Sequence, residues 1–172
     1  MVVQMLLDVA DTFQFFPAAL ISSFISFCIL NIYLKARRMR KLWKWRHVKI
    51  SILCGYLAAV FFIALLSRAP GSREGINLRL FSTLINPRLC IYFLENIVFF
   101  APLGLLLPAI FKTQKRLFVC LETSAGLSLL IELLQLFTKR GFCQIDDVFS
   151  NALGAAMGFL LYCFAAKRLN GS

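Results

Sequence analysis

The sequence predicts an all-α polytopic membrane protein: a single membrane domain over residues 1–172, with about five transmembrane helices in a compact bundle. Three observations predict this class. Of the 172 residues, 60% are hydrophobic and only 16% are charged, and the mean hydropathy is +0.78. Several stretches without Lys or Arg are long enough to cross roughly 30 Å of hydrocarbon. The basic residues gather between those stretches.

Each expected span is a stretch poor in charge that ends near Lys or Arg, and crossing a bilayer takes roughly 20 apolar residues. The predicted spans are residues 12–34, 50–67, 90–111, 117–137 and 147–166. The second span is short, and only five residues join the third span to the fourth, so those two must form a tight helical hairpin. Residues 1–11 carry two acids and no base, unlike a cleaved signal peptide, so we expect them to be retained.

The first connection, residues 35–49, holds eight of the basic residues together with Trp43 and Trp45. This composition suits a segment that lies at the headgroups of an anionic leaflet, and it also anchors the topology. The chain's one histidine, His47, lies there too. A single histidine excludes histidine-based metal sites and most Ser/His or Cys/His catalytic arrangements.

The distribution of bases predicts the orientation of the chain. Alternate sides of the five spans carry thirteen and six Lys or Arg residues. The excess marks the cytoplasmic side, so we expect the N-terminus outside and the C-terminus in the cytoplasm. The net charge of +11 comes from bases that lie between apolar segments. We therefore expect the lipid bilayer as partner, with anionic lipid at the 35–49 loop, and no nucleic acid.

The six cysteines stand singly, without the CxxC spacing of a zinc or redox site. We interpret them as small buried hydrophobic residues. Only Cys90 and Cys143 fall on the same outer surface, and their pairing is left open.

Ionisable and amide side chains inside the spans are costly, and here they fall near the outer ends of three spans and the loop between the last two. The candidate residues are Glu95, Asn96, Glu132, Gln135, Arg140, Asp146, Asp147 and Asn151. They predict a polar pocket that faces outward. Glu122 falls on the opposite face of the fourth span, near its cytoplasmic end, and does not belong to the group.

Helical phase predicts how the last two spans meet. Four polar residues of the fourth span fall within about 80° of one another, and four polar or small residues of the fifth fall within about 60°. The two stripes are Ser124, Ser128, Glu132 and Gln135, and Asp147, Asn151, Gly154 and Gly158. We expect these stripes to face each other, with the two glycines serving close helix packing.

In the third span, Pro102 and Pro108 flank Gly104. Each proline removes a backbone donor, so this helix should kink or break near the middle of the membrane.

Capping and pairing explain part of the polar group without any ligand. Asp146 or Asp147 suits the N-cap of the fifth span, and Arg140 suits neutralisation of Glu132 or Asp146. If the group forms a pocket, its carboxylate and amide oxygens suit a hard divalent cation such as Mg²⁺ or Ca²⁺. Arg140 suits a phosphate or carboxylate group of a ligand. We assign no cofactor and no metal, with Glu132 and Asp147 as the candidate ligands should a cation bind.

Two segments, ENIVFFAPLGLLLP and LSLLIELLQLFTKRGFCQIDDVFSNALGAAMGF, resemble the VanZ family, which carries an N-x-x-x-F-x-P-x-G segment and an E-x-x-Q, R, D-D, N-x-x-G series. The resemblance covers about residues 77–162. After Asn77-Leu78 the chain has Arg79-Leu80-Phe81 where many relatives continue to Pro and Phe. The matching positions are Asn96, Phe100, Pro102, Gly104, Glu132, Gln135, Arg140, Asp146, Asp147, Asn151 and Gly154.

The resemblance implies a multi-pass protein of the bacterial cytoplasmic membrane associated with low-level resistance to teicoplanin-type lipoglycopeptides. We expect a binding protein whose outward pocket takes a lipid headgroup, a cell-wall precursor or the drug's lipid anchor. The alternative is an intramembrane enzyme on a lipid-linked envelope substrate, with Glu132 or Glu95 as general base. A transporter is favoured less, because the chain shows no internal repeat. The oligomeric state is left open.

Overall fold

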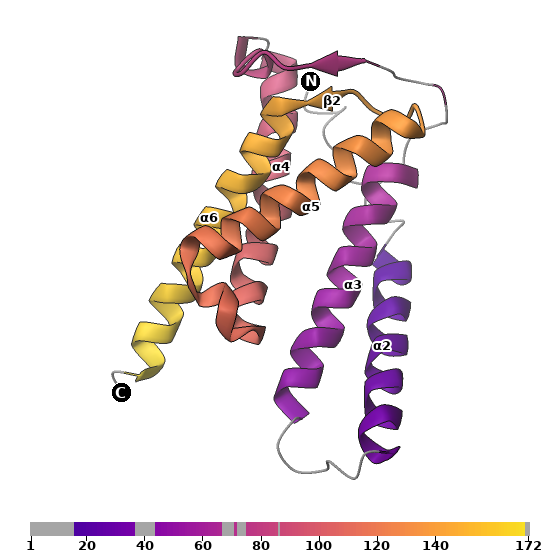
Figure 1. The fold of residues 1–172 in the computed structure, drawn as a ribbon, viewed down its shortest axis with the longest axis vertical. Helices are drawn as coiled ribbons and strands as arrows, with labels where there is room; N and C mark the ends of the chain where they lie inside the picture. Colours follow the sequence, from indigo (N-terminus) through magenta and orange to yellow (C-terminus); the bar gives the residue numbers. More distant parts are fainter. Residues whose placement is uncertain (1–15, 37–43, 67–70, 72–74, 86, 171–172) are drawn as a thin grey trace. The chain divides into compact units, whose positions relative to one another are not determined.

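The computed structural model describes residues 16–36, 44–66, 71, 75–85 and 87–170. The chain divides into two compact units, Met1–Ser67 and Arg68–Ser172. The all-α class is confirmed, since five long helices make up most of this part of the chain (Figure 1). They are α2 (Phe16–Ala36), α3 (Lys44–Leu66), α4 (Pro87–Ile110), α5 (Leu117–Phe137) and α6 (Ile145–Asn170).

Of the five spans that the sequence predicts, four appear as described helices long and apolar enough to cross a membrane. Their apolar ranges are Trp45–Leu66, Leu89–Ile110, Leu117–Phe137 and Ile145–Leu169. The remaining helix, α2, carries the shorter apolar stretch Leu20–Tyr33. The predicted start of the first span, residues 12–15, lies outside the described residues, as do residues 1–11.

In the first unit, α2 and α3 form a helical hairpin in which the Ser23 hydroxyl donates to the Ser51 carbonyl oxygen at 2.8 Å. Helix α3 begins at Lys44, six residues before the predicted span. Long basic side chains can cover apolar surface while their charged heads reach water, so they continue a helix without difficulty. His47 is therefore a buried helical residue and not part of an exposed loop, whereas Trp45 is 81% exposed. Residues 37–43, with Trp43, lie outside the described part.

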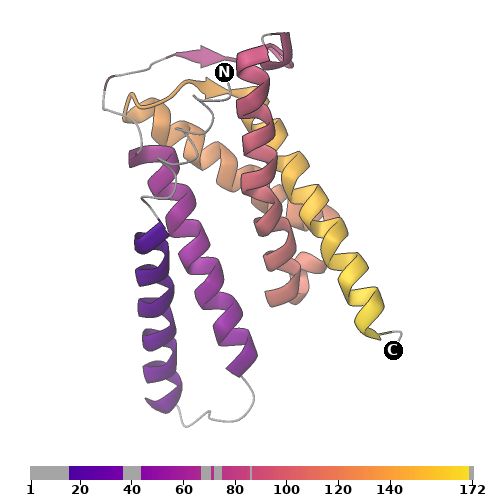
Figure 2. The ribbon, with the colours of Figure 1, turned by 180° about the vertical axis from the view of Figure 1, so that it is seen from behind.

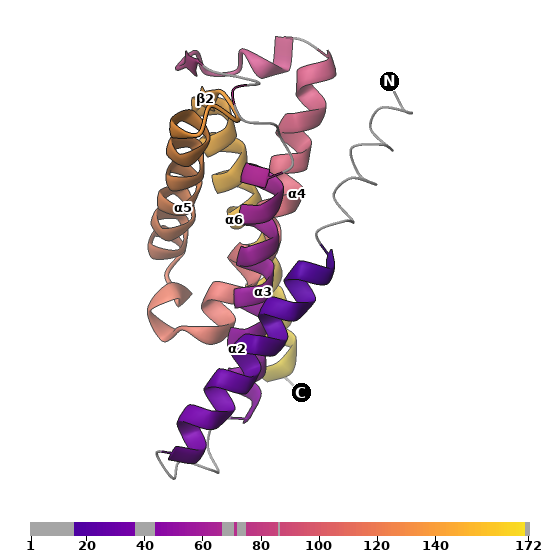
Figure 3. The same ribbon diagram turned by 90° about the vertical axis from the view of Figure 1, so that its right-hand side faces the viewer.

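The second unit contains α4, α5 and α6. Helices α4 and α6 run side by side, and α5 lies obliquely across them (Figures 1 and 2). The short 3-10 helix η2 (Lys112–Lys115) turns the chain from α4 into α5 and makes the tight hairpin that the sequence predicts (Figure 3). Buried side chains from all three helices form the core of this unit: Phe93, Phe100, Leu103, Leu107, Ile110, Cys120, Ile131, Ala155 and Phe159.

Three glycines let α4 and α6 touch backbone to backbone. A Cβ atom added at Gly104 would overlap the carbonyl oxygen of Ala155. One added at Gly154 or Gly158 would overlap the carbonyl oxygen of Ile97 or Ala101, respectively. The glycine half of the α6 stripe therefore packs against α4 and not against α5, which corrects the expected pairing of the stripes. Helix α6 packs with one face against α4 and with another against α5.

Helix α4 continues through both of its prolines without a break. Pro108 has no N–H to donate to the carbonyl oxygen of Gly104, four residues earlier. The thiol of Cys120, on α5, approaches that oxygen at 4.0 Å. A weak donor from the neighbouring helix thus partly replaces the missing hydrogen bond, which is a common way for proline to be accommodated inside a membrane helix.

A two-stranded parallel pairing closes one end of this unit. Strand β1 (Ile76–Asn77) pairs with β2 (Cys143–Gln144), with Ile76 opposite Cys143. The Cys143 N–H also donates to the Gly75 carbonyl oxygen at 2.9 Å. The sequence did not predict these strands, because two residues are too few to show an alternating pattern. The pairing joins the segment before α4 to the segment before α6.

The C-terminus of α5 ends in a Schellman motif. The Lys139 N–H donates to the Leu136 carbonyl oxygen at 3.1 Å, and the Arg140 N–H donates to the Gln135 carbonyl oxygen at 2.9 Å. Lys139 takes the left-handed position, with φ +53°, that glycine usually occupies. The motif directs the chain sharply from α5 toward β2.

Candidate functional site

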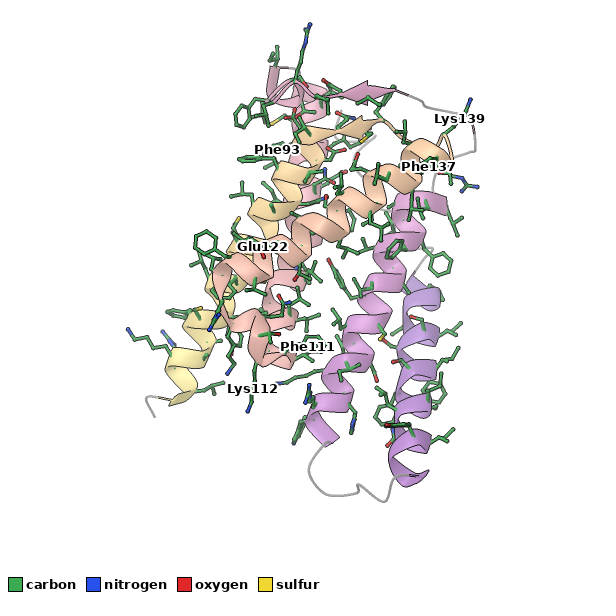
Figure 4. All side chains as sticks on the ribbon, viewed as in Figure 1. Phe93, Phe111, Lys112, Glu122, Phe137 and Lys139 are labelled. Carbon is green, nitrogen blue, oxygen red and sulfur yellow. The ribbon has the colours of Figure 1, made fainter. Side chains whose placement is uncertain are left out.

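The polar residues predicted from the sequence meet at the end of the second unit where α4 begins, α5 ends and α6 begins. Figure 4 marks this end by Phe137 and Lys139, next to β2, with Lys112 at the opposite end. We call the residues that are hydrogen-bonded there the polar cluster. It consists of Asn96, Ser128, Glu132, Asp146, Asp147 and Asn151.

Two hydrogen bonds tie α6 to both of its neighbours. Asn96, on α4, donates from its side-chain amide to the Asp147 carboxylate at 2.9 Å. One turn deeper, the Asn151 amide donates to the Ser128 hydroxyl of α5 at 2.7 Å. Ser128 and Asn151 are both buried. Asn151 of α6 therefore faces the polar stripe of α5, as helical phase predicts, whereas Asp147 of the same stripe pairs with Asn96 on α4.

Asn151 has one buried atom that the protein leaves unsatisfied. Its side chain is 5% exposed, and its Oδ1 accepts no hydrogen bond from the part of the chain that the structure describes. An acceptor buried in this way costs about 1–3 kcal/mol. The atom is therefore a place where a donor from outside the protein would be stabilising.

Glu132 receives a backbone hydrogen bond from the strand that follows its own helix. Its Oε2 accepts the Gln144 N–H at 2.9 Å, and the side chain is 3% exposed. Gln135, one turn further, is also buried. Its backbone carbonyl belongs to the Schellman motif that positions Arg140. The end of α5 is thus fixed on β2 by a carboxylate.

Asp146 holds the segment before α4 onto the first turn of α6. One carboxylate oxygen accepts the Phe81 N–H at 2.6 Å. The other accepts the Thr83 N–H at 2.9 Å, the Thr83 hydroxyl at 2.8 Å and the Ser82 hydroxyl at 3.2 Å. Asp146 is 1% exposed. Four donors fill the acceptor capacity of a carboxylate, so this residue has a structural role.

The structure shows Asp146 neither as the N-cap of α6 nor as the partner of Arg140. The donors that reach Asp146 come from residues 81–83 and not from Arg140. Helix α6 begins at Ile145, so Asp146 and Asp147 both lie in its first turn and not at the N-cap. Negative charge in a first turn is still stabilised by the helix dipole.

The other predicted polar residues lie around the cluster. Glu95 is half-buried on α4, one residue before Asn96, which places its side chain about 100° around the helix. Arg140 is half-buried in the turn after α5. Glu122 is exposed on α5, nearer the α4–α5 turn than the cluster is (Figure 4). The expected separation of Glu122 from the group therefore agrees with the structure.

Within the described residues, no group of three or more His, Cys, Asp or Glu side chains is arranged to hold a metal ion. Cys90 and Cys143 are free thiols, as are the other four cysteines. A cation held by Glu132 and Asp147 would have to complete its ligand shell with amide, backbone or water oxygens.

Sequence reasoning missed the residues that bind Asp146. Asn77 donates to the Ser82 hydroxyl at 2.9 Å and accepts the Arg79 N–H at 3.1 Å, which folds residues 77–83 into a compact loop. Thr83 is buried. The start of the family resemblance at about residue 77 is the signal in the sequence that this segment takes part in the site.

The polar cluster also affects the neighbouring thiol of Cys143. Burial raises the pKa of Cys143, and the negative charges of Glu132 and Asp147 raise it further. The thiol therefore stays protonated and weakly nucleophilic at neutral pH.

The chain is similar to known proteins of one family. A family model described as VanZ/LLP1 matches residues 50–166, which include most of α3 and all of α4 and α5. The chain is also similar to "Protein VanZ" of Enterococcus faecium, with 35% identity over 81 residues that make up 45% of this chain and 47% of that protein. The chain thus spans about half the length of this relative. No solved structure matches.

Proposed function

Because the chain belongs to the VanZ/LLP1 family, we propose that it is a multi-pass protein of the bacterial cytoplasmic membrane that lowers susceptibility to teicoplanin-type lipoglycopeptides. It does so by binding an amphiphilic ligand at the polar cluster. The ligand is a lipid headgroup, a lipid-linked cell-wall precursor or the lipid anchor of the drug. The N-terminus lies outside, so the cluster faces outward, where drug and precursor meet.

One observation carries the proposal: three helices bring hydrogen-bonding side chains together at one end, and a buried acceptor among them is left for an outside donor. Asp147 and Asn96 join α6 to α4, and Asn151 joins α6 to Ser128 on α5. Oδ1 of Asn151 is the buried acceptor. Convergent polar groups in an otherwise apolar bundle are the usual mark of a binding site.

The chemistry of the cluster favours ligands that donate hydrogen bonds. Glu132, Asp147 and Asn151 offer acceptor oxygens, and Arg140 lies in the adjacent turn and suits an anionic group on the same ligand. Hydroxyls, amides and ammonium groups beside a phosphate or carboxylate fit this combination. Lipid headgroups and cell-wall precursors carry such groups, so both fit better than a purely apolar molecule.

The test is antibiotic susceptibility in cells that carry matched amounts of each variant. We expect the wild-type chain to raise the inhibitory concentration of teicoplanin and to leave that of vancomycin unchanged. Glu132→Gln and Asp147→Asn should abolish most of the teicoplanin effect. Glu122→Gln is the matched control, because it makes the same chemical change on the same helix away from the cluster, and it should behave as wild type.

Direct binding completes the test. The purified chain should retain a labelled teicoplanin-type drug or lipid-linked precursor, and the double change Glu132→Gln with Arg140→Ala should remove that retention. Ligand binding that survives the double change, or full protection by a well-expressed Glu132→Gln variant, would contradict the proposal. Turnover of a lipid-linked substrate by the purified protein would favour an enzyme in its place.

A further inference from the structure

The segment 76–85, which ends in the short 3-10 helix η1 (Thr83–Ile85), exposes an unusual number of large apolar side chains. Ile85 is 85% exposed, Leu78 is 72% exposed and Ile76 is 64% exposed. Leu80, Phe81 and Leu84 are each between 42% and 56% exposed. Contiguous exposed apolar surface of this kind marks a site of interaction with a membrane or another protein.

The segment is fixed in place. Asp146 accepts three hydrogen bonds from Ser82 and Thr83 and a fourth from the Phe81 N–H. The Phe81 ring packs edge-on against Phe149 of α6, with 5.4 Å between ring centroids. Phe81 adopts a left-handed backbone, φ +62°, which is costly for an aromatic residue and persists only when its surroundings hold it. These contacts hold the loop in the conformation that exposes its apolar side chains.

Four backbone N–H groups of the segment donate to partners within the protein. The N–H groups of Phe81 and Thr83 donate to Asp146. Those of Arg79 and Leu84 donate to Asn77 and to the Phe81 carbonyl oxygen. Non-helical backbone enters a lipid environment only when its polar groups are paired in this way.

The segment also leads directly into a helix that exposes apolar side chains. Leu89, Leu94 and Val98 are exposed on α4, which is long and apolar enough to cross the membrane. Ile85 lies two residues before the start of that helix. Arg79, between Leu78 and Leu80, is exposed and can reach lipid phosphates from the boundary of the membrane.

From these observations we infer that the segment 76–85 is an interfacial membrane segment, whose apolar side chains insert among lipid acyl chains beside the polar cluster. Its partner is the lipid surface itself. Asp146 anchors this segment to α6, while Asp147, the next residue, belongs to the hydrogen bonds of the cluster. The inference does not depend on the proposed function, but it places acyl chains where an amphiphilic ligand would need them.

Depth-dependent quenching of a single tryptophan tests the inference. The native Trp43 and Trp45 are replaced by Phe, and one tryptophan is introduced by Leu78→Trp, Ile85→Trp or, as control, Arg79→Trp. The full chain is reconstituted in phosphatidylcholine and phosphatidylglycerol vesicles, with a nitroxide on the upper part of the lipid acyl chain. Acrylamide serves as the quencher from the water.

We expect tryptophan at positions 78 and 85 to be quenched strongly by the nitroxide lipid and weakly by acrylamide. The control at position 79 should show the reverse order, because the Arg79 side chain is the one expected to reach the lipid phosphates and water. Strong acrylamide quenching at positions 78 and 85 would overturn the inference. So would quenching by neither agent, which would mean that a second protein chain covers the segment. Leu80→Trp replaces either variant that fails to elute as a single species.

Discussion

At the scale of single residues, the main finding is that two adjacent aspartates have different roles. Asp146 is saturated by donors from residues 81–83 and acts as a structural anchor. Asp147 accepts a hydrogen bond from Asn96 and lies among the groups proposed to bind a ligand. The sequence shows only a pair of identical carboxylates. Their environments, one turned toward the 77–83 loop and one toward α4, separate their roles.

Replacement of Asp146 should destabilise the protein more than it alters any ligand specificity. Hydrogen bonds to a charged group contribute about 1.5–3 kcal/mol each and do not add fully, so we expect Asp146→Ala to lower the free energy of unfolding by about 3 kcal/mol or more. Asp146→Asn keeps one acceptor oxygen and should cost less. Thermal unfolding in detergent measures the effect. An Asp146→Ala variant as stable as the Glu122→Ala control would contradict the anchoring role.

The reactivity of Cys143 should report the charge of the cluster. Because burial and the two carboxylates raise the pKa of this thiol, its thiolate fraction at neutral pH is low and increases as the pH rises toward that raised pKa. Glu132→Gln or Asp147→Asn removes a negative charge, lowers the pKa of Cys143 and should speed its alkylation at pH 7. Mass spectrometry of the alkylated peptide gives the rate. Equal rates in wild type and both variants would refute the electrostatic coupling.

At the scale of elements, the α4–α6 contact is the most constrained feature of the second unit. Gly104 on α4 and Gly154 and Gly158 on α6 all lie where one helix backbone meets the other. In a bilayer, van der Waals contact and hydrogen bonds hold helices together, because lipid offers no hydrophobic drive for their association. The close approach also brings Asn96 within hydrogen-bond distance of Asp147.

A matched pair of glycine substitutions tests this contact. Gly158→Ala places a Cβ into the carbonyl oxygen of Ala101 and should destabilise by about 1–3 kcal/mol. Gly126→Ala, on α5, meets nothing within 4 Å, and it should stabilise by about 0.5–1 kcal/mol through helix propensity. Thermal unfolding of the two variants should therefore move in opposite directions. A shift of the same sign in both would count against the packing assigned to Gly158.

The elements that could be predicted from the sequence are those with a periodic pattern of apolar or polar residues, and segments without such a pattern could not be predicted. Long apolar stretches predicted all five helices, and helical phase predicted that the α5 stripe with Ser128 faces the α6 stripe with Asn151, two residues that the structure joins. Phase could not assign the two glycines of α6 to α4, because a helix between two neighbours has no single partner. The partners of Asp146 could not be predicted for another reason: Phe81, Ser82 and Thr83 belong to a segment without a repeating pattern, 63 to 65 residues earlier.

At the scale of the whole molecule, the distribution of charge and the count of helices make a prediction about topology. If α2 crosses the membrane as a fifth span and the N-terminus lies outside, as the sequence predicts, we expect the C-terminus that follows Lys167 and Arg168 in the cytoplasm. A fluorescent protein fused there should fold and fluoresce, and alkaline phosphatase fused there should be inactive. Active phosphatase at the C-terminus would reverse the orientation and place the polar cluster on the cytoplasmic side.

The anchor of Thr83 on Asp146 also sets an order of events during synthesis. Thr83 leaves the ribosome 63 residues before the carboxylate that will hold it. At roughly 5–20 residues per second, that interval lasts about 3 to 13 s. During it, α4 and α5 are made while the loop lacks its counterpart and its strand partner. The six large apolar side chains of the loop are exposed in the finished structure as well, so the arrival of α6 does not bury them but fixes the loop that carries them.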